Sequence, residues 1–266
     1  MKIKTPNRYQ ALIESIFVKH YRRGKKVVPF TREELISTAQ QLKIVVPSNL
    51  GDVLYSFRYR NPLPQKILDT QPAGEEWQIE GMGKARYAFR LVPVNRIAPN
   101  LNLVTTKIPD ATPEIISSTS LSDEQALLAK VRYNRIIDIF LGITAYSLQN
   151  HLRTTVQGMG QIEIDEVYVG LDKHGCQYII PVQSKGGSDQ LSTVQSRQDM
   201  ACCSEKFPNL VCRAVSAQFL NDDRIAMFEL CLDDQGLVRT VEERHYRLVP
   251  ADQIGASDLA SYRSRA

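Results

Sequence analysis

Residues 160–187 read GQIEIDEVYVGLDKHGCQYIIPVQSKGG. β-branched and aromatic residues fill both halves, and Asp-Lys-His-Gly lies between them, so the stretch predicts a β-hairpin. If Gly175 closes a three-residue loop in the left-handed conformation, Asp165 faces Gln183 and Glu163 faces Lys185. A slip of one residue in this register would scatter these four side chains to both faces.

Facing residues point to the same side of a sheet, so Glu163, Asp165, Gln183 and Lys185 are predicted to converge at the open end of the hairpin. Oxygen ligands of this kind suit Mg²⁺, with Mn²⁺ as a substitute. An ammonium beside them can orient a water molecule and stabilise negative charge on a phosphoryl group. The plainer interpretation of the same spacing is a structural ion pair between Glu163 and Lys185 across the strands.

Asp165, a hairpin and then Gln183-x-Lys185 resemble the PD-(D/E)XK nuclease superfamily, in the branch with glutamine in place of the acidic residue. The resemblance covers about residues 123–232, with one helix before the hairpin, then a second helix and two strands after it. It implies a restriction-endonuclease-like α/β domain with a mixed central sheet flanked by helices.

The same resemblance implies a role for each residue. Asp165 is the metal ligand, Gln183 is a weak ligand, and Lys185 is the catalytic ammonium. Because Gln183 supplies no charge, Glu163 is expected to serve as the second carboxylate. A further acid on the preceding helix would be Glu124 or Asp138, and the sequence does not choose between them.

The first hundred residues form a basic module. Residues 1–98 carry 17 Lys and Arg against 8 Asp and Glu, whereas residues 99–266 carry 16 against 21. Helical periodicity, a capping-box signature at Thr31 and Glu34, and two alternating strands around Met82-Gly83-Lys84 predict three helices followed by a hairpin. This order resembles the winged-helix family of DNA-binding domains, and the resemblance implies DNA contacts from the third helix and the wing: Arg58, Tyr59, Arg60, Lys84 and Arg86.

We therefore predict an α+β protein with a winged-helix domain over 1–97, a linker over 98–122 and a nuclease-like domain over 123–266. The linker is inferred from a stretch rich in Pro, Ser and Thr with few charges. No signal peptide and no membrane span are expected. The five cysteines form no CxxC pair, which indicates reduced thiols in a cytoplasmic protein.

The function expected from these features is Mg²⁺-dependent hydrolysis of duplex DNA, in its most concrete form by a type II restriction endonuclease. Cutting both strands calls for two sites, so a homodimer is expected. A repair or junction-resolving nuclease, and a DNA-binding regulator with an inactive nuclease fold, remain open alternatives. A third is an adaptor that binds proteins through the winged helix.

Overall fold

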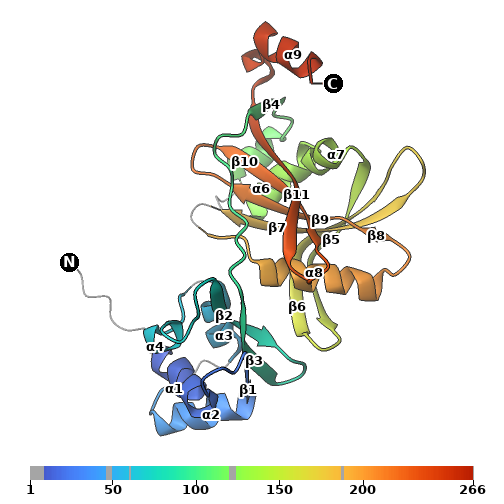
Figure 1. Ribbon diagram of the computed structural model, residues 1–266. Coiled ribbons are helices and arrows are strands. Elements are labelled where there is room, and N and C mark those ends of the chain that lie inside the picture. The colour runs from blue at the N-terminus through green and yellow to red at the C-terminus, as the bar shows by residue number, and fades with distance from the viewer. Residues whose placement is uncertain (1–8, 46–49, 60, 120–123, 187–188, 266) are drawn as a thin grey trace, which may run out of the picture. The chain divides into compact units, whose positions relative to one another are not determined.

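The chain is an α+β protein, as the sequence predicts (Figure 1). The computed structural model describes residues 9–45, 50–59, 61–119, 124–186 and 189–265, apart from the side chains of Asp52, Tyr55, Tyr59, Glu124 and Gln125. It divides into two units: Met1–Asn95 with Thr155–Ile162, and Arg96–Thr154 with Glu163–Ala266. Among the described residues, no helix combines the length and the apolar composition that crossing a membrane requires.

The first unit combines helices with a three-stranded sheet of order β1-β3-β2. Its elements are α1 (Gln10–His20), β1 (Val27–Thr31), α2 (Arg32–Gln41), α3 (Gly51–Tyr59), α4 (Gln65–Leu68), β2 (Glu75–Gly81) and β3 (Arg86–Pro93). The three helices and the hairpin are confirmed, while β1 and the single turn α4 were not predicted. Phe17 lies at the centre of the core, with its ring 5.1 Å from both Trp77 and Phe89.

The predicted capping box at the start of α2 is present. The Thr31 hydroxyl accepts a hydrogen bond from the Glu34 N–H at 3.3 Å, and the Thr31 N–H donates to Glu34 Oε2 at 3.0 Å. His20 of α1 lies 2.6 Å from the other carboxylate oxygen of Glu34. Partial burial opposes ionisation of Glu34, but the hydrogen bonds from Thr31 and His20 hold its pKa below the usual value. This carboxylate therefore links α1 to the start of α2.

Replacing Thr31 with alanine is expected to destabilise the first unit by about 1 kcal/mol, because the Glu34 N–H loses its acceptor. Urea unfolding can be followed by the fluorescence of Trp77, the chain's one tryptophan, which is buried in this core. Ser37→Ala, at an exposed position within α2, is the matched control. Equal losses in the two variants would contradict a specific capping effect.

The second unit is built on a large mixed sheet of order β4-β11-β10-β9-β7-β6-β5, with β8 paired to β7. Its elements are β4 (Thr105–Pro109), α5 (Glu114–Thr119), α6 (Glu124–Tyr133), α7 (Ile136–Leu141), β5 (Thr144–Val156), β6 (Gly160–Leu171), β7 (Gln177–Gly186), α8 (Thr193–Lys206), β8 (Val211–Cys212), β9 (Ala214–Phe219), β10 (Arg224–Leu232), β11 (Val238–Val249), a 3₁₀ turn (Ala251–Gln253) and α9 (Ala256–Arg263).

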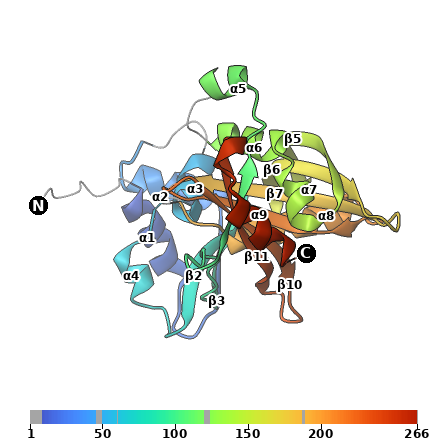
Figure 2. The same ribbon diagram turned by 90° about the horizontal axis from the view of Figure 1, so that it is seen from above.

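Helices cover both faces of this sheet (Figure 2). α6 and α7 pack on one face, where Leu128 and Phe140 join Ile180 of β7 in a single apolar core. α8 packs on the other face, where Met200 joins Phe228 of β10. β7 pairs antiparallel with β6 and parallel with β9, and α8 makes the crossover between the two parallel strands. The predicted mixed sheet flanked by helices is therefore present.

The long helix predicted before the hairpin is two helices. Arg135, between α6 and α7, has a left-handed backbone conformation with φ 52°. The buried amide of Asn134 stabilises the break, because its Oδ1 accepts from the Ala111 N–H at 2.6 Å and its Nδ2 donates to Thr112 at 2.9 Å. These partners lie more than 20 residues away in the chain, so helical periodicity alone does not reveal the break.

The linker predicted for 98–122 is not a simple connection. Its residues Thr105–Pro109 form β4, which pairs in parallel with β11, and Glu114–Thr119 form α5. The boundary between the units falls at Asn95, and residues 155–162 group with the first unit. The sequence TTKIP has no alternation that marks a strand, and its pairing partner lies about 140 residues later, so composition alone did not reveal β4.

Candidate active site

The β6–β7 hairpin has the predicted register. Glu166 pairs with Val182, and the pairing continues to Leu171 and Gln177. Gly175 adopts the left-handed conformation with φ 83°. The Asp172 carboxylate accepts hydrogen bonds from the His174 and Cys176 N–H groups and so stabilises the loop. The turn chemistry therefore fixes which side chains of the two strands share a face.

At the open end of the hairpin, Asp165 and the Gln183-x-Lys185 motif come together. Asp165 Oδ2 accepts a hydrogen bond from the Ser184 N–H at 2.9 Å, so the aspartate bridges directly to β7 between the two motif residues. On the other side of β7, Gln183 pairs with Ser216 and Lys185 with Gln218 of β9. Gln183 and Lys185 are both buried, and their pairing with β9 holds their backbone in place.

A second carboxylate, Asp199 of α8, completes this cluster. Its side chain is fully buried, and its Oδ2 accepts a hydrogen bond from Gln183 Nε2 at 2.7 Å. Burial raises the pKa of the Asp199 carboxyl well above its usual range. The charge of Asp165 adds to the rise, while the Gln183 hydrogen bond and the Lys185 ammonium oppose it. Asp165 and Lys185 therefore both lie within electrostatic range of Asp199.

Sequence reasoning did not identify Asp199. A signal was available, because α8 carries Val194, Met200 and Cys203 on its buried side, and an aspartate on such a face requires a partner. Only the spatial contact with Gln183 makes the role of the aspartate visible.

Glu163 lies at the edge of this cluster and has basic partners on β5. Its carboxylate is 3.2 Å from Arg153 Nε and 3.2 Å from His151 Nδ1, and its side chain is 39% exposed. The strand β5 was not predicted, so these partners were not foreseen. The Glu163 carboxylate is directed to β5, while its backbone oxygen is 3.4 Å from Gln183 Nε2.

Asp138 and Glu124 are the two acids predicted as a further metal ligand from the preceding helices, and the structure describes the side chain of Asp138 alone. Asp138 of α7 forms an ion pair with Arg135 and accepts a hydrogen bond from the Ala145 N–H at 2.9 Å, so it stabilises the turn from α7 into β5. The Glu124 side chain lies outside the described residues. Asp138 therefore has a structural role. Glu124 stays a prediction as the helix acid of the metal site.

The chemistry of the cluster fits a hard divalent cation. Gln183 Oε1 and Asp199 Oδ1 are buried oxygens without a hydrogen-bond partner in the described part of the chain. With Asp165 they provide an all-oxygen set with two carboxylates, the number through which Mg²⁺ is commonly held. The described residues contain no group of three or more His, Cys, Asp or Glu side chains arranged for a metal ion.

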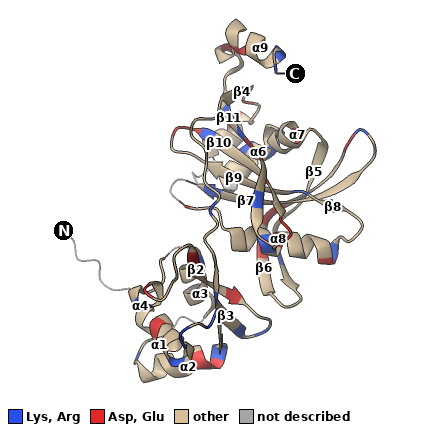
Figure 3. Ribbon diagram, in the orientation of Figure 1, with Lys and Arg blue, Asp and Glu red and all other residues tan. Residues whose placement is uncertain are grey.

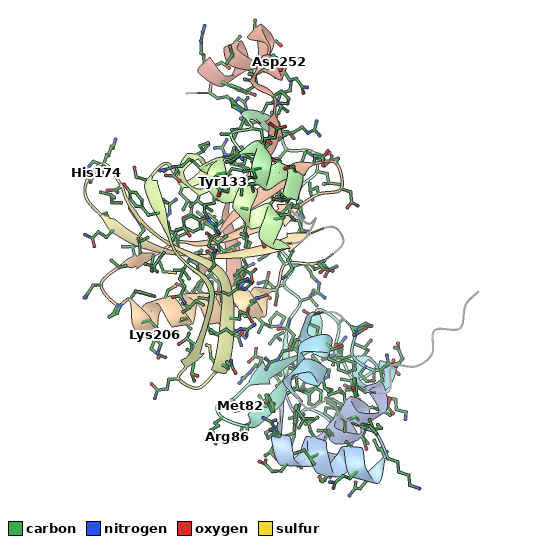
Figure 4. The ribbon with its side chains drawn as sticks, turned by 180° about the vertical axis from the view of Figure 1, so that it is seen from behind. Met82, Arg86, Tyr133, His174, Lys206 and Asp252 are labelled. Carbon is green, nitrogen blue, oxygen red and sulfur yellow. The ribbon has the colours of Figure 1, made fainter. Side chains whose placement is uncertain are left out.

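The residues expected to contact DNA are only partly described. Lys84 and Arg86 are exposed in the β2–β3 hairpin, and Arg86 projects near Met82 at its tip (Figure 4). Arg58 is half-buried, with its Nε and Nη2 atoms inaccessible to solvent. The side chain of Tyr59 and the whole of Arg60 lie outside the described residues. Among the described members of the predicted set, Lys84 and Arg86 are therefore the exposed ones.

Searches with this chain against models of protein families, against curated proteins and against solved structures found no match.

Proposed function

We propose that the protein is a Mg²⁺-dependent endonuclease that hydrolyses phosphodiester bonds of duplex DNA, in its most concrete form a type II restriction endonuclease of the cytoplasm. The observation that carries the proposal is the convergence of Asp165, Gln183, Lys185 and Asp199 at one end of β6 and β7. The succession of α6–α7, β5, β6, β7, α8 and β9 supports it, because it places the motif strands in a sheet covered by helices on both faces.

Each residue has a role that follows from its surroundings. Asp165, Asp199 and Gln183 Oε1 would hold the Mg²⁺ ion, which stabilises charge on a phosphoryl oxygen and lowers the pKa of bound water. Asp199 also fixes the Gln183 carboxamide through the 2.7 Å hydrogen bond, which leaves Oε1 as the free acceptor. Lys185, whose backbone pairs with β9, orients the attacking water and stabilises the negative charge that develops on phosphate.

The proposal replaces Glu163 with Asp199 as the second carboxylate. Glu163 already pairs with Arg153 and lies 3.2 Å from His151 of β5, whereas Asp199 is directed at Gln183. Once it has lost its proton, the buried Asp199 carboxyl would supply the charge that glutamine lacks. Glu163 then contributes by positioning β5 rather than by binding the ion.

The proposal is tested by incubating supercoiled plasmid and linear duplex DNA with the protein, with Mg²⁺, with Mn²⁺ and with excess chelator. Metal-dependent cleavage of both substrates supports a duplex endonuclease. Discrete fragments support the restriction enzyme, whereas cleavage confined to branched or damaged DNA supports a repair or junction-resolving nuclease. Absence of cleavage with either metal ion, across DNA substrates of widely different sequence, would refute the nuclease proposal.

One observation favours a second candidate, a DNA-binding regulator with an inactive nuclease fold. Burial raises the pKa of Asp199 well above its usual range, which opposes the ionisation that a metal ligand requires. Tight DNA binding that does not change with Mg²⁺, together with no cleavage, would support the regulator. The plasmid experiment and a binding titration therefore separate the two candidates.

The proposed wing of the first unit is the β2–β3 hairpin, which carries basic segments in Figure 3. Lys84→Ala and Arg86→Ala are each expected to weaken DNA binding for all sequences. Each should also reduce the slope of log K against log[salt] by about 1, since each contact releases about one counterion. Fluorescence anisotropy at several salt concentrations measures both effects.

Lys66→Ala is the matched control for these two variants. Lys66 is an exposed lysine of the same unit that pairs with Glu14 at 2.6 Å. Its loss should leave the salt slope unchanged. If all three variants behave alike, the hairpin makes no particular contact with DNA.

A further inference from the structure

The two edge strands of the large sheet, β4 and β5, differ in whether another part of the chain contacts them. At the β4 edge, the Tyr262 hydroxyl of α9 accepts a hydrogen bond from the Lys107 N–H at 3.0 Å and donates one to the Lys107 carbonyl at 3.3 Å. Lys107 Nζ also pairs with Asp258 of α9 at 2.9 Å. Figure 1 shows α9 beside β4. This edge is therefore covered within the chain.

The opposite edge is β5, the last strand of the sheet in the described part of the chain. It is 13 residues long, and residues 146–151 are all exposed. Residues 144–150 include no Lys, Arg, Asp, Glu or Pro, although Tyr146 is 56% and Leu148 51% exposed. Proteins that remain monomeric usually protect such an edge with charges, prolines or a covering segment, because an open strand pairs readily with another strand.

We propose that β5 pairs with β5 of a second copy of this chain, antiparallel about a two-fold axis at Ser147. Ser147 Oγ donates to Glu166 Oε1 at 2.7 Å, so its side chain points to the α6 face of the sheet. Alternation then directs Tyr146 and Leu148 to the other face. With the axis at Ser147, Tyr146 of each copy lies opposite Leu148 of the other, and an aromatic ring beside an aliphatic side chain is a favourable cross-strand pair.

Charge also favours a second copy as the occupant. A two-fold axis brings the same segment together twice, so a charged segment would repel itself, and residues 144–150 are neutral. The nearest basic residues, His151 and Arg153, are each matched by Glu163 of their own chain. The homodimer expected from the need to cut two strands thus has a specific interface, and this interface does not depend on nuclease activity.

The test is the mass of the full chain in solution, measured by light scattering and by sedimentation without DNA or metal. The wild type should be a dimer at micromolar concentrations, and Tyr146→Lys or Leu148→Glu should each weaken the dimer by about tenfold or more, because each faces an apolar side chain with a charge. Val241→Lys, at a 59% exposed position on β11, is the matched control and should remain dimeric.

Mixing the two variants provides the decisive measurement. In the heterodimer, Lys at position 146 of one chain faces Glu at position 148 of the other, while the second site keeps its Tyr146–Leu148 pair. The mixture should therefore dimerise at concentrations where each variant alone is monomeric, which misfolding cannot explain. A monomeric wild type, a dimer indifferent to both variants, or a mixture that does not recover would each overturn the proposal. None of these results affects the cleavage assay, so the two proposals fail separately.

Discussion

Lys185→Ala is expected to reduce metal-dependent DNA cleavage by about 100- to 1,000-fold, the usual cost of losing one well-placed stabilising group. Lys185 is buried, its backbone pairs with β9, and it lies within electrostatic range of Asp199. In the proposed mechanism, its ammonium would therefore lie near the phosphate that the metal ion contacts. Single-turnover cleavage of a plasmid measures the loss, and a binding titration should show DNA affinity close to the wild-type value.

Lys173→Ala is the matched control, since Lys173 is an exposed lysine in the loop of the same hairpin. Its cleavage rate should equal that of the wild type. Retained cleavage by Lys185→Ala would place the catalytic centre elsewhere, and an equal loss in both variants would indicate a general effect of charge. Lys185→Arg keeps the charge but changes its shape, so partial activity there would separate charge from geometry.

Asp199→Asn is expected to weaken Mg²⁺ binding and to slow cleavage by about 10- to 100-fold or more, as loss of a group at a metal site does. The variant keeps the volume and the hydrogen bond to Gln183 but removes the charge. Calorimetric titration with Mg²⁺ in the absence of DNA measures binding directly. Asp165→Asn should show a loss at least as large, because it removes the other carboxylate.

The raised pKa of Asp199 gives this prediction a pH signature. A carboxyl whose pKa is raised must lose its proton before it can bind a cation, so Mg²⁺ affinity should increase as pH rises through that pKa. Mg²⁺ binding should also release a proton to the buffer, which calorimetry in buffers of different ionisation enthalpy detects. Asp199→Asn should abolish both the pH dependence and the proton release.

Two controls identify the second carboxylate. Glu163→Gln removes a charge that the structure pairs with Arg153, so it should affect Mg²⁺ affinity less than Asp199→Asn does. Asp234→Asn changes an exposed acid in the β10–β11 turn and should have no effect. A larger loss in Glu163→Gln than in Asp199→Asn would restore Glu163 as the ligand and remove Asp199 from the site.

Local signals predicted the hairpin at the centre of the second unit well. The glycine at 175 and the aspartate at 172 set the loop, the loop set the register, and the register set which side chains share a face. The capping box at Thr31 was equally readable, because both of its hydrogen bonds lie within four residues. Interactions between residues a few positions apart therefore leave a local sequence pattern from which the structure can be predicted.

Interactions that are long in sequence left no such pattern. β4 is a strand because β11 lies beside it, the break at Arg135 is stabilised by residues near Ala111, and Asp199 acquires a role only through Gln183. β5 was missed for a related reason. As an exposed edge strand it lacks the buried alternate positions that mark a strand in sequence.

The hydroxyl of Tyr262 has a consequence for the proposed assembly through β5. This hydroxyl occupies the backbone groups of Lys107 at the β4 edge, so if β5 pairs with a second copy as proposed, the other edge of the sheet would not offer these groups to a further copy. A sheet with both sides open could instead add copies without limit and grow into a fibre. In the proposed assembly, the Tyr262 hydroxyl would thus favour a closed dimer over an open fibre.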